Sequence, residues 1–286
     1  MLTVADDVQG ERTIRLVNDW GSADIALYGA QVHSWKNAEG AEYLFVSGRR
    51  YREAGKAVRG GIPVCWPWFG LHSADPSLGR HGFVRTLVWK PGPVCEIGDR
   101  TRIVLSCFDD DRTRVIWNFS FRLDLEITLG PSLDLVLYST NMDSVAFELT
   151  DAFHAYFLVD SASRARISGF LGAECTDSRA GSGSAEAVWV GSGDVADLGS
   201  HVDRVYHCET ASVLYGISAG GGVRLSKEGF PETVVWNPGP VLADALADLG
   251  SMEARRMVCM EAVCGSPKTV APGETVVQKM MLSPVF

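Results

Sequence analysis

The chain has 286 residues, of which 46% are hydrophobic and 21% charged, and its formal net charge at pH 7 is -9. This composition is typical of a globular protein that is long enough to bury a sizeable core. The acidic balance, without any basic tract, argues against nucleic acid or an anionic membrane surface as the main partner.

The N-terminal residues, MLTVADDVQGERTIRL, contain no basic segment followed by an apolar core, so we expect no secretory signal. No apolar run approaches the roughly 20 residues needed to cross a bilayer. The seven cysteines form no C-x-x-C pair and no zinc-type spacing with histidine. We therefore expect reduced core thiols, no metal site and a cytoplasmic protein.

Alternation of apolar and polar residues dominates the chain. It is clearest at 121–129, FRLDLEITL, which indicates an antiparallel strand with one face buried. Similar strand-like runs lie at 13–17, 23–29, 31–36, 42–46, 102–108, 133–140, 151–157, 165–170, 204–208, 212–217, 222–226, 232–237, 256–263 and 275–282.

Helical periodicity is nearly absent. The one short candidate is LADALADL at 242–249, and the Gly- and Ser-rich stretch at 181–194 is typical of a surface loop. No long linker interrupts the strand-like runs. The sequence therefore predicts an all-β fold, a large antiparallel β-sandwich with at most short helices, forming a single domain over residues 1–286.

The segment VRGGIPVCWPWFG at 58–70 is too rich in glycine, proline and aromatic residues for a regular strand. Gly60 and Gly61 permit a close approach of backbone, and the prolines fix the loop shape. Its aromatic residues, Trp66 among them, either plug the core or form the wall of a sugar site, because the C–H faces of a sugar stack on aromatic rings.

Arginines flank this loop and the next one. Arg59 opens the first, and GRHGFVR at 79–85 places Arg80 and Arg85 around His81. Arginine suits bidentate binding of phosphate, although a single surface arginine is usually only solvated. Three arginines beside glycine-rich loops favour an anion site.

Two ionisable residues interrupt otherwise apolar strands. His154 lies within DAFHAYF at 151–157, on the face of Ala152 and Tyr156 if the strand is continuous. Glu261 lies within RMVCMEAVCG at 256–265, where a buried carboxylate costs several kcal/mol unless it is paired or neutral. Each has a structural explanation alone, but together they supply an acid–base pair.

Six runs of the sequence resemble the D-hexose-6-phosphate mutarotases (glucose-6-phosphate 1-epimerases), which have the galactose-mutarotase-like sandwich fold. The runs occur in the family's order over nearly the whole chain. They are RGGIPVCWPWFG at 59–70, HGFVR at 81–85, AFHAYF at 152–157, DRVY at 203–206, VVWNPGP at 234–240 and VCMEA at 258–262.

The resemblance implies a role for each matching residue. His154 would be the general acid at the sugar ring oxygen, and Glu261 the general base at the anomeric hydroxyl. Arg59 and Arg85 would hold the phosphate, and Asp203 would accept hydrogen bonds from sugar hydroxyls. By analogy with carboxylate pairs that span a sugar, we expect the acid and base roughly 5–8 Å apart.

We also expect Trp66, Arg80 and His81 to contact the substrate. Arg80 departs from the family pattern, which has glutamine before this histidine, so the sugar phosphate that fits best stays open. The reaction would interconvert α and β anomers by ring opening and closure, which needs no cofactor. We expect a monomer whose partner is a small-molecule sugar phosphate.

Three alternatives remain. A mutarotase for unphosphorylated aldoses would have no use for the three arginines. A non-catalytic carbohydrate-binding protein would have no reason to hold both His154 and Glu261. A purely structural sandwich would leave the aromatic loop unexplained.

Overall fold

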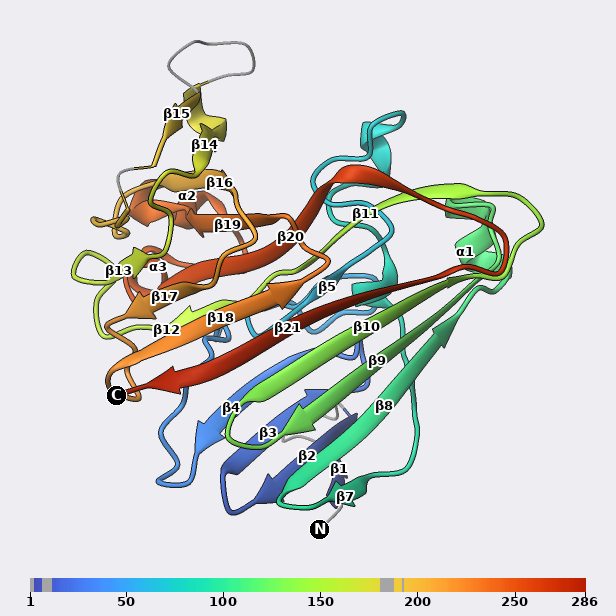
Figure 1. The fold of residues 1–286 in the computed structure, drawn as a ribbon, viewed down its shortest axis with the longest axis horizontal. Coiled ribbons are helices and arrows are strands. Elements are labelled where there is room, and N and C mark those ends of the chain that lie inside the picture. The colour runs from blue at the N-terminus through green and yellow to red at the C-terminus, as the bar shows by residue number, and fades with distance from the viewer. Residues whose placement is uncertain (1–2, 7–11, 181–187, 192) are drawn as a thin grey trace.

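A computed structural model describes residues 3–6, 12–180, 188–191 and 193–286. Within these residues the strands form three sheets, and every pairing between named strands is antiparallel (Figure 1). The smallest sheet has the order β1-β2-β3-β4. Its strands are β1 (Thr3–Asp6), β2 (Arg12–Asn18), β3 (Gly21–Ala26) and β4 (Val32–Asn37).

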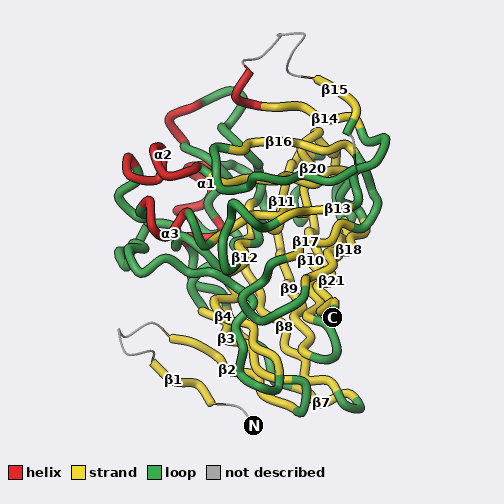
Figure 2. The backbone as a smooth tube through the Cα atoms, turned by 90° about the vertical axis from the view of Figure 1, so that its left-hand side faces the viewer, coloured by secondary structure: helices red, strands yellow, loops and turns green. Residues whose placement is uncertain are grey.

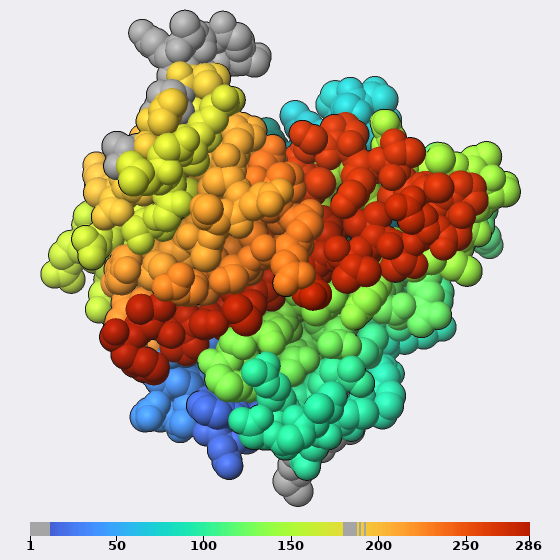
Figure 3. Space-filling view, in the orientation of Figure 1, coloured from blue at the N-terminus to red at the C-terminus, as the bar shows by residue number. Residues whose placement is uncertain are grey.

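The nine-stranded sheet has the order β13-β17-β18-β21-β10-β9-β8-β6, and β7 also pairs with β8. Its outward face is at the front of Figure 1, and β21 forms a dark red band across that face in the space-filling view (Figure 3). The strands are β6 (Lys90–Pro91), β7 (Cys95–Ile97), β8 (Arg100–Phe108), β9 (Phe121–Leu129), β10 (Leu133–Asn141), β13 (Arg166–Ser168), β17 (Ser212–Tyr215), β18 (Gly222–Glu228) and β21 (Thr275–Val285).

The eight-stranded sheet has the order β15-β14-β16-β19-β20-β11-β5, and β12 also pairs with β20. Its strands are β5 (Val64–Cys65), β11 (Phe147–Phe153), β12 (Tyr156–Leu158), β14 (Glu174–Asp177), β15 (Val188–Val190), β16 (Val202–His207), β19 (Glu232–Asn237) and β20 (Met257–Val270). The predicted all-β antiparallel sandwich is thereby confirmed.

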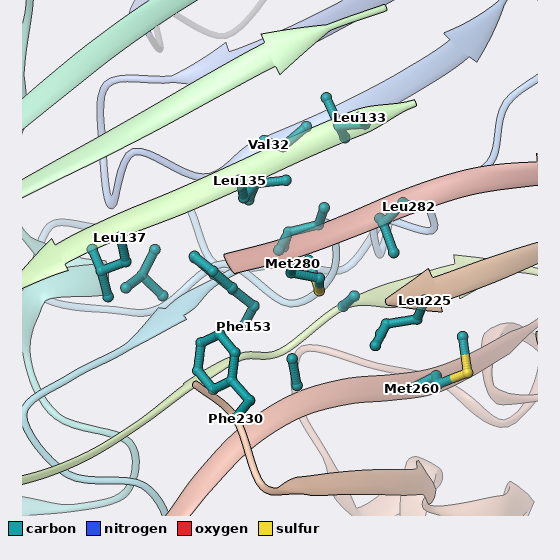
Figure 4. Close-up of a cluster of buried hydrophobic side chains, with 14 of the residues drawn as sticks. Val32, Leu133, Leu135, Leu137, Phe153, Leu225, Phe230, Met260, Met280 and Leu282 are labelled. Atoms are coloured by element: carbon teal, nitrogen blue, oxygen red, sulfur yellow. The ribbon is translucent and has the colours of Figure 1, made fainter. Parts of the chain in front are cut away.

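The main apolar core lies between the two larger sheets. Figure 4 shows Leu135 and Leu137 of β10 with Met280 of β21 on one side, and Phe153 and Met260 from the other sheet opposite them. On β9 the residues predicted to face inward are buried and alternate with partly or fully exposed ones. The core contains residues from Ile14 to Leu282, and the single domain over 1–286 stays a prediction.

The described residues contain three short α-helices. α1 (Asp111–Ile116) connects β8 to β9 at one end of the nine-stranded sheet (Figure 1), whereas α2 (Gly239–Ala245) and α3 (Ser251–Ala254) lie on the side away from that sheet (Figure 2). The helix expected at 242–249 begins earlier, because Pro240 fits the first helical turn, and it ends at Ala245, since Leu246 is extended. No helix in the described ranges is long and apolar enough to span a membrane.

Two other sequence predictions need correction. The run 42–46 forms only isolated bridges, at Glu42, Leu44 and Val46, rather than a strand. The expected loop at 181–194 contains β15, whose valines suit a strand and which pairs with β14. Residues 181–187 and 192 of that loop lie outside the described residues.

Candidate active site

The strand expected at 151–157 is interrupted at His154. β11 ends at Phe153 and β12 begins at Tyr156, and both pair with β20. At this break the backbone N–H of His154 donates to the carbonyl of Pro63 at 3.0 Å, and that of Tyr156, the first residue of β12, donates to the carbonyl of Gly61 at 2.9 Å. At this point, carbonyls of the glycine-rich loop therefore accept hydrogen bonds that a neighbouring strand would otherwise accept.

The break brings the imidazole of His154 beside the carboxyl of Glu261. His154 Nδ1 and Glu261 Oε1 are 3.3 Å apart, and the two residues are 7% and 1% exposed. His154 Nδ1 and Glu261 Oε2 are buried without a hydrogen-bond partner among the described residues. The pair lies closer than the expected 5–8 Å. Carboxylates that act on a glycosidic bond stand on either side of it. An acid and a base that open a sugar ring act on two oxygens bonded to the same carbon, so they can lie closer together.

Burial sets the protonation of this pair. Loss of solvation lowers the pKa of His154 well below its ordinary value, and the charges of His81, Arg59 and Arg85 act in the same direction. Loss of solvation also raises the pKa of Glu261 well above its ordinary value. Both shifts favour the neutral forms, an imidazole with a single ring proton and a protonated carboxyl.

The register of the eight-stranded sheet aligns a row of side chains next to Glu261. Asp203 of β16 is opposite Trp236 of β19, Trp236 is opposite Cys259 of β20, and Cys259 is opposite Tyr156 of β12. Directly paired residues of antiparallel strands share a face. The row lies on the outer face of the sheet, away from the main core, and forms the floor of the candidate site.

Tyr156 is a site residue that the sequence did not single out. Its ring stacks on that of His154, with the centroids 4.6 Å apart and the planes at 6°. Its hydroxyl lies 3.4 Å from His154 Nε2 and accepts a hydrogen bond from Arg59 Nη1 at 3.2 Å. Trp236, also missed, stands edge-on to both rings.

Arg59 is more tightly engaged than expected. Its Nε and Nη2 donate to the two carboxylate oxygens of Asp248, at 3.1 and 3.2 Å, in the fork geometry of a bidentate pair. Asp248 lies between α2 and α3 and is 6% exposed. The side chain of Arg59 is 23% exposed, and two of its five N–H groups are left free by these bonds and the bond to Tyr156.

His81, Arg80 and Arg85 lie at the rim of the site. The ring of His81 is edge-on to His154, with 5.7 Å between centroids. His81 Nδ1 accepts a hydrogen bond from the Gly70 N–H at 3.2 Å, so its neutral ring carries the proton on Nε2. Burial and then the neighbouring arginines lower the pKa of His81 to about 3. Arg85 Nη2 donates to the Arg80 carbonyl at 2.6 Å.

Trp66 is the one proposed substrate residue that the structure does not bring to this group. Its side chain is fully buried and packs against Phe83, Trp117, Phe121 and Phe147 in the main core. The structural interpretation of the aromatic loop therefore holds for Trp66. The tryptophan that lies beside His154 and Tyr156 is instead Trp236, which comes from the VVWNPGP run.

A set of possible metal ligands also occurs here, although the sequence predicted none. Ligand atoms of His154, Cys259 and Glu261 all lie within 4.8 Å of one another. The spacing of these residues along the chain does not indicate the set, because His154 meets β20 only in the folded sheet.

This combination of features defines a class of protein. A large antiparallel β-sandwich that holds an imidazole and a carboxyl on the outer face of one sheet, beneath a cationic rim, has the architecture of the galactose-mutarotase-like proteins. Residues 12–283 match the model of the aldose 1-epimerase family. The chain belongs to that family and is an isomerase.

Individual relatives agree with this assignment. A protein of Cenchrus ciliaris named "Putative glucose-6-phosphate 1-epimerase" is 37% identical over 276 residues, covering 92% of this chain and 81% of that protein. A protein of the same name from Escherichia coli (strain K12) is 31% identical over 245 residues, covering 85% and 80%.

Solved structures share the fold. The crystal structure of "a putative mutarotase (YeaD) from Salmonella typhimurium" has a TM-score of 0.87 and 26% identity, covering 99% of this chain and 92% of that one. The Slr1438 protein from Synechocystis sp. PCC 6803 has a TM-score of 0.79 at 18% identity, covering 95% and 94%, and supports the fold alone.

Proposed function

We propose that the protein interconverts the α and β anomers of a hexose 6-phosphate, with glucose 6-phosphate as the first candidate. The observation that carries the proposal is the buried pair of His154 and Glu261, 3.3 Å apart, on a sheet face bordered by Arg59, Arg80 and Arg85. The names of the relatives from Cenchrus ciliaris and Escherichia coli point to the same substrate.

The chemistry needs one proton donor and one proton acceptor. The acceptor removes the proton from O1 while the donor protonates O5, so that the C1–O5 bond breaks and the C1–O1 bond becomes a carbonyl. Rotation about C1–C2 and reversal of both transfers give the other anomer. His154 and Glu261 share one proton and exchange roles on ring closure, and each positioned transfer contributes roughly 10²–10⁴-fold.

The family's assignment makes His154 the acid, whereas burial places the resting proton on Glu261. The two descriptions differ by one proton transfer across 3.3 Å. That transfer leaves the total charge of the pair unchanged.

Different rim residues hold the phosphate and the sugar in this proposal. Arg85 is partly buried, and its Nε has no hydrogen-bond partner in the described part of the chain, which leaves a charged donor for an anion. Arg80 is exposed at the same rim, and the free N–H groups of Arg59 add a third cationic donor. Neutral His81 donates from Nε2 to a sugar oxygen, and Asp203 accepts from sugar hydroxyls.

One observation favours the second candidate, a mutarotase for unphosphorylated aldoses. The bidentate bond to Asp248 compensates the charge of Arg59, so Arg59 attracts a phosphate less strongly than a free arginine would. The phosphate preference then depends on Arg80 and Arg85.

Exchange NMR with the purified protein distinguishes the two candidates. We expect faster exchange between the α and β signals of glucose 6-phosphate than between those of glucose at equal concentration. Equal rates would favour the aldose mutarotase, and no acceleration of either would favour a binding protein. In Arg80→Gln, weaker binding of glucose 6-phosphate would make Arg80 a phosphate ligand, whereas a changed sugar preference would make it a specificity residue.

We further propose a cytoplasmic monomer that acts on a small-molecule sugar phosphate, without nucleic acid or membrane partners. All seven cysteines are free thiols, which supports a reducing compartment. Light scattering coupled to size-exclusion chromatography tests the monomer, for which the chain mass is 31.0 kDa.

A further inference from the structure

Cys259 lies within the acid–base site but takes no part in the proton transfers. It is fully buried on β20, two residues before Glu261 on the same face of the strand. Its thiol makes no hydrogen bond to any of the described residues. With His154 and Glu261 it forms a group whose nitrogen, sulfur and oxygen atoms lie within 4.8 Å of one another.

The donor set of this group is that of a zinc site. A thiolate, an imidazole and a carboxylate bind Zn²⁺ at about 2.0–2.3 Å, which places tetrahedral ligand atoms roughly 3.3–3.6 Å apart. His154 Nδ1 and Glu261 Oε1 are already 3.3 Å apart. The other pairs have to approach by no more than about 1.5 Å, which side-chain rotation provides.

The site also offers unused coordination capacity. His154 Nδ1 and Glu261 Oε2 are buried and lack a partner among the described residues. When Nδ1 binds a metal, Nε2 carries the ring proton and faces the Tyr156 hydroxyl at 3.4 Å, an outer partner of the kind that orients metal-binding histidines. The thiolate and the carboxylate together balance the two charges of the ion.

We propose that His154, Cys259 and Glu261 form a Zn²⁺ site and that the ion, by occupying the acid–base pair, inhibits the enzyme. Binding replaces the thiol proton, which passes to solvent. A thiolate selects Zn²⁺ over Mg²⁺, which prefers oxygen ligands. The inhibition rests on the proposed function, whereas the metal binding is measurable without any sugar.

Cobalt substitution tests the site directly. The chelator-treated protein is titrated with Co²⁺ and then with Zn²⁺. We expect a thiolate-to-cobalt charge-transfer band that saturates at one ion per chain and disappears as Zn²⁺ displaces Co²⁺. In Cys259→Ala the band should be absent and the Zn²⁺ affinity lower by at least about a hundredfold, because loss of an outer partner alone costs 10–100-fold.

Cys264→Ala is the matched control. Cys264 lies on the same strand but packs in the main core on the opposite face, so this variant should keep the band and the affinity of the wild type. A band that persists in Cys259→Ala, or the absence of one-to-one binding in the wild type, would overturn the proposal.

Kinetics test the inhibition separately. Zn²⁺ should compete with glucose 6-phosphate and be reversed by chelator, and Mg²⁺ should have no effect. Zn²⁺ should no longer lower the rate of Cys259→Ala, measured relative to the metal-free rate of that same variant. Inhibition of equal strength in Cys259→Ala would assign the effect to another site. If the protein turns over no sugar, the cobalt titration still decides whether the metal site exists.

Discussion

On the outer face of β20, the residues that flank Glu261 are apolar or weakly polar: Met257, Cys259 and Val263 are all buried there. An ionised carboxylate at such a position loses several kcal/mol of solvation. Burial therefore keeps the proton on the residue until a partner or substrate takes it. The apolar strand thus provides the pKa shift that a proton donor at neutral pH requires.

Removing either member of the pair should abolish most catalysis while leaving the fold intact. We expect His154→Asn and Glu261→Gln each to lower kcat by about 10²–10⁴-fold, because neither amide transfers a proton at the required position. Exchange NMR with glucose 6-phosphate measures the rate. A wild-type rate in His154→Asn would make the imidazole structural, and one in Glu261→Gln would move the base role to Asp203.

The stability of Glu261→Gln provides the control for folding. The folded-state pKa of Glu261 is raised, so its contribution to stability is present at low pH and lost as the pH rises above its unfolded-state pKa. A neutral glutamine avoids this loss. The inactive variant should therefore unfold at pH 7 at no lower urea concentration than the wild type.

The two partly buried arginines of the rim should respond differently to truncation. Arg85→Ala should raise KM for glucose 6-phosphate by roughly ten- to a hundredfold, since a hydrogen bond to a charged group contributes about 1.5–3 kcal/mol. It should leave unfolding nearly unchanged. Arg59→Ala should raise KM too, but it should also lower the free energy of unfolding by a few kcal/mol, because Asp248 would stay buried without its partner.

The double variant Arg59→Ala/Asp248→Asn separates these effects. It should recover part of the lost stability but not the affinity. If Arg59→Ala leaves both KM and the urea midpoint unchanged, Arg59 neither binds the phosphate nor stabilises the fold through its ion pair with Asp248.

The loop 59–70 passes close to neighbouring backbone only because its glycines lack side chains. A Cβ at Gly61 would lie 2.2 Å from the Val32 carbonyl oxygen, and one at Gly60 would lie 2.4 Å from Val46 Cα. Both residues have positive φ. This close approach lets the carbonyls of Gly61 and Pro63 accept hydrogen bonds around His154.

Gly61→Ala should accordingly be severely destabilising. The left-handed conformation costs an alanine about 1–2 kcal/mol, and the clash with backbone adds to that. Gly40→Ala is the control, because Gly40 has a similar φ of +83° and nothing within 4 Å of its added Cβ. Urea unfolding should show a clearly larger loss for Gly61→Ala. Equal losses would mean that the loop moves aside at little cost.

The period-two pattern was sufficient to predict most strands, since one buried face imposes alternation. The pattern did not predict the break in the strand at His154. There the backbone N–H groups donate to carbonyls of the 61–63 loop, which is remote in sequence, instead of to a neighbouring strand. Trp236, Tyr156 and Asp248 were missed for a related reason. Each looks like an ordinary strand or helix residue until the register places it beside His154 or Arg59.

Asp151 and Gln278 form a polar contact that joins the two large sheets. Gln278 Nε2 of β21 donates to Asp151 Oδ1 of β11 at 2.7 Å, and both residues are fully buried. Asp151 Oδ2 and Gln278 Oε1 have no partner among the described residues. Burial raises the pKa of Asp151 to about 7, which the bond from Gln278 partly offsets.

This contact should make stability depend on pH. The raised folded-state pKa means that the contribution of Asp151 is fully present below about pH 4 and is lost as the pH rises toward 7. Asp151→Asn should thus add on the order of 2–4 kcal/mol at pH 8 and little at pH 4. Urea unfolding at both pH values measures it, with Asp19→Asn as an exposed control. Equal effects at pH 4 and 8 would contradict the assignment.

The cationic residues of the rim all come from the stretch 59–85, whereas the acid, the base and the aromatic floor come from the sheet and the chain just before β12. In the proposed function, substrate recognition and proton transfer are therefore encoded in separate parts of the sequence. A chimera that received this stretch from a relative with another sugar preference would keep its proton-transfer groups. Such a graft has to include the residue at 248, because the Arg59 guanidinium is held by both carboxylate oxygens of Asp248.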